Sequence, residues 1–392
     1  MFKHLFKLMW NKRSQNFLFL SEILISFLVV FAVFSYITYY YQNYSKPLGF
    51  DYNRVWAIAY SGEQLSKNPD TLTTFYANLE KGLKSMPEIK EVSFASSNFP
   101  YSSSFMSTGI KFGKKEFNMI SSYTVTNNYN KVWNVELADG RWFLPEDLVG
   151  KDKAIIINES LSKEMFGKDK GIGKLIGDDV NSKMKVIGVI HDFKSDGDFS
   201  PMNNIMFKQL DTGYLKWTST VLLKVHETAD ATFESKLYKF MTNATRSAVE
   251  IQHVDEMRAA KNRNTLIPIF LFVIVAAFLI INVALGLFGV LWYNINKRKG
   301  EIGLRRAIGA SGTSVSMQMV MESIILTTIS LLIGCFFAIQ FPLLNVFNIP
   351  ASVYVIAILI AVLFIYALVL ACSLYPGKQA AAIHPAIALH ED

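Results

Sequence analysis

Four stretches of the chain are apolar over a greater length than a helix buried in a small domain needs, and they limit the possible folds more than any other feature. They run from Phe17 to Tyr41, from Leu266 to Tyr293, from about Val315 to Phe341 and from about Ser352 to Leu374. A helix of about 20 apolar residues crosses the hydrocarbon core of a bilayer. Since lipid offers no hydrogen-bond partner to the backbone, each stretch is predicted to be a transmembrane α-helix.

Most charged residues lie in one long region between the first and second apolar stretches. Residues 42–265 contain 29 of the 39 Lys and Arg, 27 of the 32 Asp and Glu, and neither of the two Cys. A region of this length buries its own core without disulfides. The remaining positive charge flanks the apolar stretches instead of forming one basic face, so we expect no binding to nucleic acid.

Positive charge at the ends of the apolar stretches predicts the side of the membrane that each segment occupies. Four cations precede the first stretch, and five fall within the ten residues Lys297–Arg306. Because cytoplasmic loops carry an excess of Lys and Arg, we expect residues 1–16, 294–314 and 375–392 in the cytoplasm. Residues 42–265 and the short loop 342–351 then lie on the opposite side. The first stretch lacks a small-residue cleavage site, which favours an uncleaved anchor.

The long region shows strand and helix patterns in the same order near both of its ends. Strand-like Val55–Tyr60 and Glu91–Ala95 flank a helical pattern, and Val221–Val225 and Val249–Val254 flank another. Two such βαβ units can share one sheet with both helices on one face, as in a ferredoxin-like layout. The insert between them, about 98–217, is predicted to be β-rich with one short helix. The expected fold is therefore a four-helix membrane domain plus an α+β domain in which two βαβ units bracket a β-rich insert.

The cytoplasmic segment 294–314 is predicted to contain a short amphipathic helix from about Gly300. Leu304, Ala307 and Ile308 fall on one side of it, and Glu301 and Arg305 are spaced to pair on another. Gly309 and Gly312 supply the backbone freedom that ends the helix. On charge alone, a loop that solvates lipid phosphates is the alternative interpretation.

The order of residues in this segment resembles a known family. The sequence KRKGEIGLRRAIGAS, followed by Glu322 and Ser323, is similar to the signature of FtsX/MacB-type permeases of ABC transporters. The tail YPGKQAAAIHPAIALHED and the run AIIINESLSKEMFGKDKGIGKLIG resemble the same family, so the resemblance covers nearly the whole chain. It implies a periplasmic core domain for residues 42–265, a location in the bacterial inner membrane, and a coupling segment that docks on a cytoplasmic ATPase. The implied ATPase-coupling residues are Glu301, Ile302, Gly303, Arg305, Arg306, Ala307, Gly309 and Ala310.

The resemblance also implies a function and partners. We expect a non-catalytic permease subunit without a cofactor, with ATP bound by a separate ABC ATPase. Two copies, or one copy and a related permease, are needed to meet two ATPase subunits. Export of a peptide, antibiotic or lipoprotein is the first interpretation, with a periplasmic adaptor as a possible partner. Control of a periplasmic cell-wall hydrolase without transport is the second, and a sensor with a ligand-binding outer domain is the third.

Other motifs give no catalytic or metal site. The glycine spacing of GKDKGIGKL differs from a phosphate-binding loop, and neither HExxH nor GxSxG occurs. His191 with Asp192, and His253 with Asp255, lack a third ligand at a recognisable spacing. We interpret these residues as parts of surface loops.

Three polar residues fall within the apolar stretches, namely Glu22, Asn282 and Glu322. Ionisable groups are costly in lipid and often functional. We predict that the two glutamates pair with basic residues at the cytoplasmic rim, because a proton relay needs further ionisable residues across the membrane. Asn282 needs a hydrogen-bond partner, so the second stretch is predicted to pack against other helices.

Overall fold

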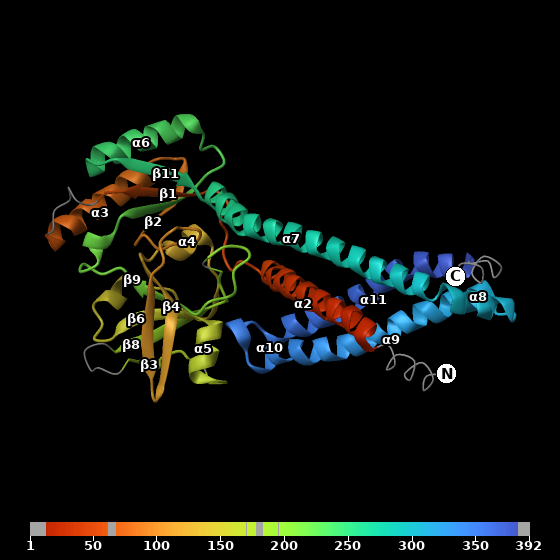
Figure 1. The fold of residues 1–392 in the computed structure, drawn as a ribbon. Helices are drawn as coiled ribbons and strands as arrows, with labels where there is room; N and C mark the ends of the chain where they lie inside the picture. The colour runs from red at the N-terminus through yellow and green to blue at the C-terminus, as the bar shows by residue number, and fades with distance from the viewer. Residues whose placement is uncertain (1–12, 62–67, 170, 178–182, 195, 383–392) are drawn as a thin grey trace. The chain divides into compact units, whose positions relative to one another are not determined.

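The computed structural model describes residues 13–61, 68–169, 171–177, 183–194 and 196–382. The start of the predicted N-terminal segment and the end of the predicted tail lie outside the described residues. The chain forms two compact units, a helical unit of Met1–Gln42 with Leu266–Asp392 and an α/β unit of Asn43–Thr265 (Figure 1). Each unit is described separately below.

Four long helices dominate the helical unit, and each is long and apolar enough to cross a membrane. They are α2 (Arg13–Tyr44), α7 (Val254–Lys297), α9 (Gly312–Ala338) and α11 (Ala351–Ala382). The shorter elements are α8 (Lys299–Ala307), α10 (Gln340–Leu343) and the 3-10 helix η3 (Val346–Asn348). The prediction of four apolar helices is confirmed.

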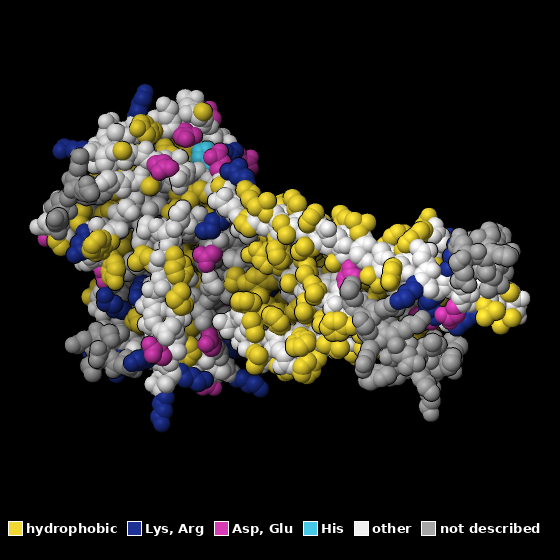
Figure 2. Space-filling model, viewed as in Figure 1, with side chains coloured by type: hydrophobic (Ala, Val, Ile, Leu, Met, Phe, Trp, Pro, Cys, Tyr) yellow, Lys and Arg dark blue, Asp and Glu magenta, His cyan; other side chains and the backbone are white. Residues whose placement is uncertain are grey.

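The helical unit carries apolar side chains inside and outside. Phe27 is fully buried and packs on Gly334, where an added Cβ would lie 2.5 Å from the Phe27 ring. Phe270, Phe278 and Leu363 are at least 64% exposed, and apolar atoms form a continuous band over these helices in Figure 2. An apolar exterior of this kind is what a bilayer solvates.

One end of the α/β unit is a four-stranded antiparallel layer in the order β11-β1-β10-β2. Its strands are β1 (Val55–Tyr60), β2 (Ile89–Ala95), β10 (Thr220–Val225) and β11 (Val249–His253). Helix α3 (Pro69–Lys84) connects β1 to β2, and α6 (Ala231–Thr245) connects β10 to β11. Leu79 of α3 and Leu237 of α6 belong to the same buried cluster, so both helices cover one face of the layer.

The rest of the α/β unit extends this sheet through a single residue pair between β2 and β4, Ala95 and Val125. The order continues β4-β9-β6-β8-β5, with β4 parallel to β9 and β6 parallel to β8. The strands are β3 (Ser107–Phe112), β4 (Lys115–Val125), β5 (Leu137–Gly140), β6 (Lys153–Asn158), β7 (Leu175–Ile176), β8 (Met184–Ile190) and β9 (Ile205–Gln209). The helices are α4 (Tyr129–Trp133), α5 (Glu159–Phe166) and the 3-10 turns η1 (Pro145–Leu148) and η2 (Leu215–Trp217). The described part thus has two short α-helices where the sequence predicted one.

Two membrane helices attach to neighbouring strands of the layer. β11 ends at His253 and α7 begins at Val254 without a loop, while the chain leaving α2 leads into β1. β1 and β11 are antiparallel, with Trp56 opposite His253. Both helices are therefore joined to the same end of this strand pair.

A buried set of charges, here named the Lys194–Asp198 cluster, lies where these segments meet in the α/β unit. Lys194 is 1% exposed, and its Nζ donates to the carbonyl oxygens of Asn43 at 2.6 Å and Asp198 at 2.9 Å. The Asp198 carboxylate, in a residue only 2% exposed, accepts hydrogen bonds from Arg258 and Tyr101. The cluster thus ties the last turn of α2 to the first turns of α7, and its paired charges offset the cost of burial.

Candidate functional site

Helix α8 lies between the end of α7 and the start of α9, and one of its faces is packed against both. Ile302 is 1% exposed and forms a small apolar cluster with Ile295 of α7 and with Val315 and Met319 of α9. Gly303 is buried beside it, and Ala310 packs against the same cluster. This contact fixes the orientation of α8 on the two helices that it connects.

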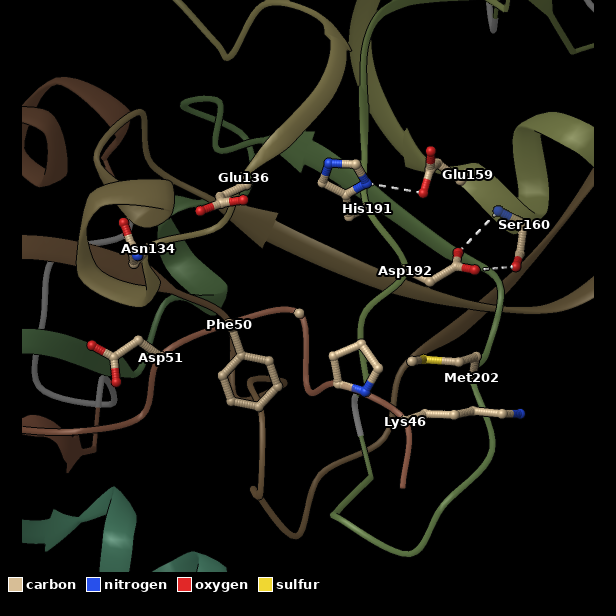
Figure 3. A pocket seen from close by; sticks show the side chains of 12 residues that line it. Lys46, Phe50, Asp51, Asn134, Glu136, Glu159, Ser160, His191, Asp192 and Met202 are labelled. Carbon is tan, nitrogen blue, oxygen red and sulfur yellow. Dashed lines mark hydrogen bonds and ion pairs between the residues drawn. The ribbon is translucent and has the colours of Figure 1, made fainter. Parts of the chain in front are cut away.

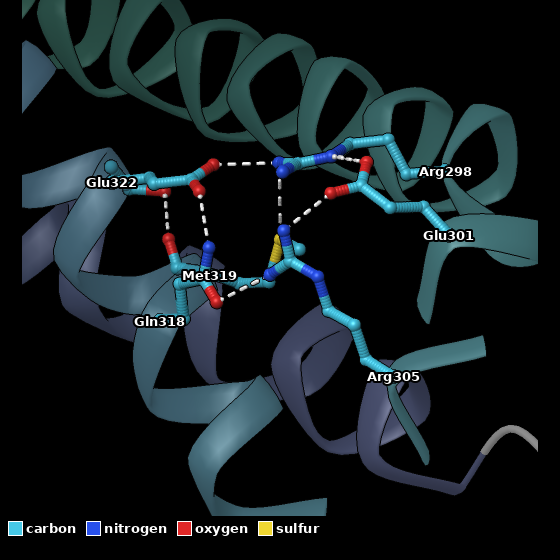
Figure 4. A network of polar contacts seen from close by, with 7 residues as sticks. Arg298, Glu301, Arg305, Gln318, Met319 and Glu322 are labelled. Atoms are coloured by element: carbon cyan, nitrogen blue, oxygen red, sulfur yellow. Dashed lines mark hydrogen bonds and ion pairs between the residues drawn. The ribbon is translucent and has the colours of Figure 1, made fainter. Parts of the chain in front are cut away.

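Five side chains, here named the polar ring, close a circuit of hydrogen bonds beside the cluster (Figure 4). Arg298 contacts Glu301 at 3.2 Å and Glu322 at 2.7 Å. Arg305 donates to Glu301 at 2.6 Å and to Gln318 at 2.7 Å. Gln318 then donates to Glu322 at 3.0 Å, which closes the ring. Charge-assisted hydrogen bonds are stronger than neutral ones, so the ring holds α8 to α9.

Arg298 is the least exposed charge of the ring, with its side chain only 11% exposed. Burial alone would lower the pKa of Arg298, but its hydrogen bonds to Glu322 and Glu301 raise that pKa above its usual value. The guanidinium therefore stays charged and pairs with both carboxylates.

The opposite face of α8 is apolar and open. Leu304 is 54% exposed, Ile308 is 78% exposed and Ala307 is exposed as well. We call these three residues, of which Ile308 directly follows the helix, the apolar face of α8. Gly309 follows with φ +104°, a left-handed conformation that favours glycine, and an added Cβ there would meet no atom within 4 Å. Gly309 thus ends the helix through its backbone conformation.

The end of α8 and the turn after it contact α11. Arg306 donates from Nη1 to the Ala381 carbonyl oxygen at 2.5 Å. An added Cβ at Gly312 would lie 2.5 Å from that nitrogen and 3.0 Å from the same carbonyl oxygen, so only glycine fits without rearrangement. Ser311 accepts a hydrogen bond from the Ser314 backbone nitrogen and caps α9.

The eight residues selected from the sequence therefore have different positions. Glu301 and Arg305 are in the polar ring, Ile302 and Gly303 are buried, Arg306 contacts α11, Ala307 and Gly309 are exposed, and Ala310 is partly buried. Arg298 and Gln318 are not among them, although both belong to the ring. The sequence feature that indicates both residues is Glu322. An acidic group in an apolar helix needs polar partners, which lie one turn away or at the end of a neighbouring helix.

The three polar residues predicted to lie in the membrane have different kinds of partner. Glu322 pairs with Arg298, a basic residue between α7 and α8. Glu22 lies against Gly286, and its Oε2 has no hydrogen-bond partner among the described residues, so the predicted basic partner is not found there. Asn282 is exposed and donates to the Phe278 carbonyl oxygen of its own helix at 2.8 Å. An i−4 carbonyl thus satisfies its side chain locally. Helix α7 packs against other helices through apolar residues, as predicted, with Leu287 in the same buried cluster as Phe27 of α2.

Each of the two histidines considered from the sequence lies beside one glutamate. His191 lies 3.0 Å from Glu159, and His253 lies 3.3 Å from Glu234. Within the described residues, no group of three or more His, Cys, Asp or Glu side chains is placed to hold a metal ion.

The fold and the connecting helix define a class of protein, an integral membrane protein with a large α/β unit between its first two long apolar helices. Two family models match the chain. The MacB-like periplasmic core domain matches residues 17–237, more than half of the chain, and the FtsX-like permease C-terminal domain matches residues 273–385. The chain belongs to the MacB/FtsX-type family of ABC transporter permeases.

Relatives with known names agree with this assignment. The chain is 25% identical over 287 residues to the uncharacterized ABC transporter permease YknZ of Bacillus subtilis (strain 168), covering 70% of this chain and 68% of YknZ. It is 24% identical over 265 residues to the macrolide export ATP-binding/permease protein MacB of Bdellovibrio bacteriovorus, covering 64% of this chain. The chain spans 40% of the length of that MacB relative.

Two solved structures are also similar in part. The periplasmic region of MacB from Actinobacillus actinomycetemcomitans matches with a TM-score of 0.39 and 16% identity, covering 54% of this chain and 94% of that one. The extracellular domain of YknZ from Gram-positive bacteria matches with a TM-score of 0.36 and 17% identity, covering 50% and 99%.

Proposed function

We propose that this permease is a non-catalytic membrane subunit whose α8 binds a separate cytoplasmic ABC ATPase. The observation that carries the proposal is the apolar face of α8, where Ile308 is 78% exposed on a helix held from its other side by the polar ring. A short helix suits insertion into a groove of a partner when it exposes apolar side chains and its opposite face is held by the rest of the protein. The MacB relatives support it, since their name joins ATP binding to permease function.

The proposed mechanism moves α8 when the ATPase binds and hydrolyses ATP. The apolar cluster at Ile302 and the polar ring link α8 to both α7 and α9. α7 is one helix from the end of β11 to the residue before Arg298, so a displacement at α8 has a continuous element along which to act. The ATP-driven step thus reaches the α/β unit, which we place in the periplasm of a bacterium with α8 and both termini in the cytoplasm.

The proposed assembly contains two permeases, as a homodimer or with a related chain, because each chain offers one α8 and an ABC ATPase dimer has two subunits. A periplasmic adaptor completes it if the substrate leaves the periplasm. The substrate class is an amphipathic molecule such as a peptide, antibiotic or lipoprotein, in keeping with the name of the MacB relatives. A regulator of cell-wall hydrolases or a sensor would use the same ATPase contact without net transport.

A substitution on the apolar face tests the ATPase contact. The full chain carrying Ile308→Asp is purified in mild detergent, and the retained ABC ATPase and its hydrolysis rate are measured. Burial of an isoleucine contributes about 1.5–3 kcal/mol, so we expect retention to fall about tenfold or more. Leu344→Asp is the matched control, since Leu344 is 72% exposed but belongs to the segment between α10 and η3. Equal retention by both variants and the parent would remove α8 as the docking element.

A second pair of variants separates ATPase docking from lipid binding. Gly309→Leu forces a leucine into a left-handed conformation, and Glu301→Lys removes the acidic member shared by Arg298 and Arg305. If α8 docks on an ATPase, both variants reduce ATPase retention while the chain still inserts. If α8 only solvates anionic lipid, Glu301→Lys binds anionic vesicles more tightly because it adds a cation, and Gly309→Leu changes little.

A further inference from the structure

The α/β unit contains a cavity of about 760 Å³ that the ATPase contact does not use (Figure 3). It opens at the carboxyl ends of the parallel strands β6 and β8, where Glu159 and Ser160 follow one strand and His191 and Asp192 follow the other. The carboxyl ends of parallel strands are a common place for ligands, and the volume falls in the range of small-molecule sites.

One side of the cavity is apolar. Phe50, Pro47 and Met202 line it. The Phe50 ring packs against Trp133 and Phe193, with ring centroids 5.5 and 4.7 Å away. These two rings fix its position. This side offers a rigid surface to an apolar group.

The rest of the lining is strongly acidic, with four carboxylates and one lysine, Lys46. Three of the four carboxylates have partners within the unit. Asp192 accepts hydrogen bonds from the Ser160 nitrogen and hydroxyl at the start of α5, and Asp51 pairs with Lys224 at 2.7 Å. Glu159 lies beside His191, and Glu136 makes no side-chain hydrogen bond among the described residues.

Glu136 and Glu159 stand on either side of the His191 ring in Figure 3. Glu136 is exposed and makes no side-chain hydrogen bond within the described part of the chain. Glu159 contacts Nδ1 of His191 at 3.0 Å. Around His191 the wall thus offers the carboxylates of Glu136 and Glu159 to a ligand, with Lys46 and Asn134 as side-chain donors elsewhere in the lining.

We propose that this cavity binds an organic cation, a protonated amine or guanidinium carried on an apolar body. The charged head lies among Glu136, His191 and Glu159, and the body lies on Phe50. A metal ion does not suit the site, because no group of three His, Cys, Asp or Glu side chains in the described part is placed to hold one. This inference stands apart from the proposed ATPase contact, since no residue of α8 takes part.

Matched ligands test the charge requirement. The full chain is placed in nanodiscs of phosphatidylcholine and titrated calorimetrically with N-acetyl-Phe-Arg-amide and with its neutral isostere, N-acetyl-Phe-citrulline-amide. We expect the arginine peptide to bind at least about tenfold more tightly, because charge-assisted hydrogen bonds are roughly twice as strong as neutral ones. Equal affinities would overturn the proposal. Spermidine, a cation without an apolar body, should bind more weakly, and equal binding would overturn the role of Phe50.

Matched variants test the location. Glu136→Gln should weaken the arginine peptide about fivefold, the effect of losing one partly screened charge pair. Glu116→Gln is the control, because Glu116 is also exposed but lies in β4, outside the cavity lining. An equal loss in both variants would mean that the peptide responds to the overall field of the unit, and no loss in Glu136→Gln would remove the cavity as its site.

Discussion

Asp198 shows how much one buried charge contributes in this protein. Its carboxylate accepts hydrogen bonds from Arg258, Tyr101 and Asn262. Asp198→Asn keeps the shape of the side chain but removes the charge that faces Arg258. Hydrogen bonds to charged groups contribute about 1.5–3 kcal/mol, so we expect a loss of that size in the free energy of unfolding of the α/β unit. Thermal unfolding followed by tryptophan fluorescence measures it.

The control for this variant is Asp211→Asn. Asp211 pairs with Lys153 at 3.1 Å, but the two side chains are 31% and 69% exposed. An exposed pair contributes about 0–1 kcal/mol, so this variant should melt close to the parent. Similar losses in both variants would contradict the special role of the Lys194–Asp198 cluster.

The lowered pKa of Asp198 makes its contribution to stability depend on pH. Burial opposes its ionisation, but hydrogen bonds from Arg258, Tyr101 and Asn262 outweigh burial and hold its pKa below the usual value. A carboxyl with a lowered folded pKa stabilises the fold above its unfolded pKa of about 4, and this contribution is lost as pH falls through the folded pKa. The stability difference between parent and Asp198→Asn should therefore be full above about pH 5 and shrink below about pH 4. A difference that stays constant throughout acid unfolding would contradict an ionised Asp198.

Single residues also show where sequence reasoning stops. Glu322 could be predicted to pair with a rim cation because its charge is costly in an apolar helix. The choice of Arg298 among five nearby cations depends on the turn between α7 and α8, which charge counting does not describe. Asn282 indicated correctly that α7 packs against other helices, although the carbonyl that its side chain needs comes from its own helix.

For single elements, α8 allows a direct test of its two faces. Ile302 is buried in the apolar cluster, whereas Leu304 is 54% exposed. Truncation of a buried isoleucine costs about 2–5 kcal/mol, so Ile302→Ala should speed hydrogen exchange of the α8 amides by about 30-fold or more. Leu304→Ala should leave exchange unchanged. If both variants exchange alike, α8 is not anchored through Ile302.

The periodicity of α8 was readable from the sequence because its apolar and charged residues alternate with a helical period. The full lengths of α7 and α11 were not readable from the sequence. The predicted membrane-spanning stretches began at Leu266 and ended at Leu374. The helices that contain them are longer, since α7 begins at Val254 and α11 continues through Pro376 to Ala382. The polar turns of these helices carry no membrane signal, and Pro376 is normally read as a helix end.

For the whole molecule, local patterns located most strands but not their neighbours. β1 pairs with β10, more than a hundred residues later in the chain, and β6 joins β8 in parallel. Such pairings depend on packing between distant segments, for which a single sequence has no periodic signal. The cavity beside His191 has the same origin, since its lining comes from helix α5 and from three connections that lie far apart in the sequence.

The proposed orientation of the whole chain is tested by labelling. In a background with Cys335 and Cys372 replaced by alanine, single cysteines are introduced at Ala307 and at Lys114, both of which are exposed. Excess Lys and Arg beside α8 predict a cytoplasmic face there. An impermeant thiol reagent should therefore label Lys114→Cys but not Ala307→Cys in intact spheroplasts. The reverse pattern would invert the topology and the proposed ATPase contact with it.

The attachment of α2 and α7 to one end of the β1–β11 pair has a mechanical consequence. A force that separates the two attachment points acts across the strands, so it opens the ladder like a zipper, one hydrogen bond at a time from Trp56 and His253. The same force along the strands would load every bond at once. The Lys194–Asp198 cluster bridges the two attachment points through Asn43 and Arg258, and it must yield before the zipper starts to open. We therefore expect the Lys194–Asp198 cluster to be the first contact that breaks when the two helices are pulled apart.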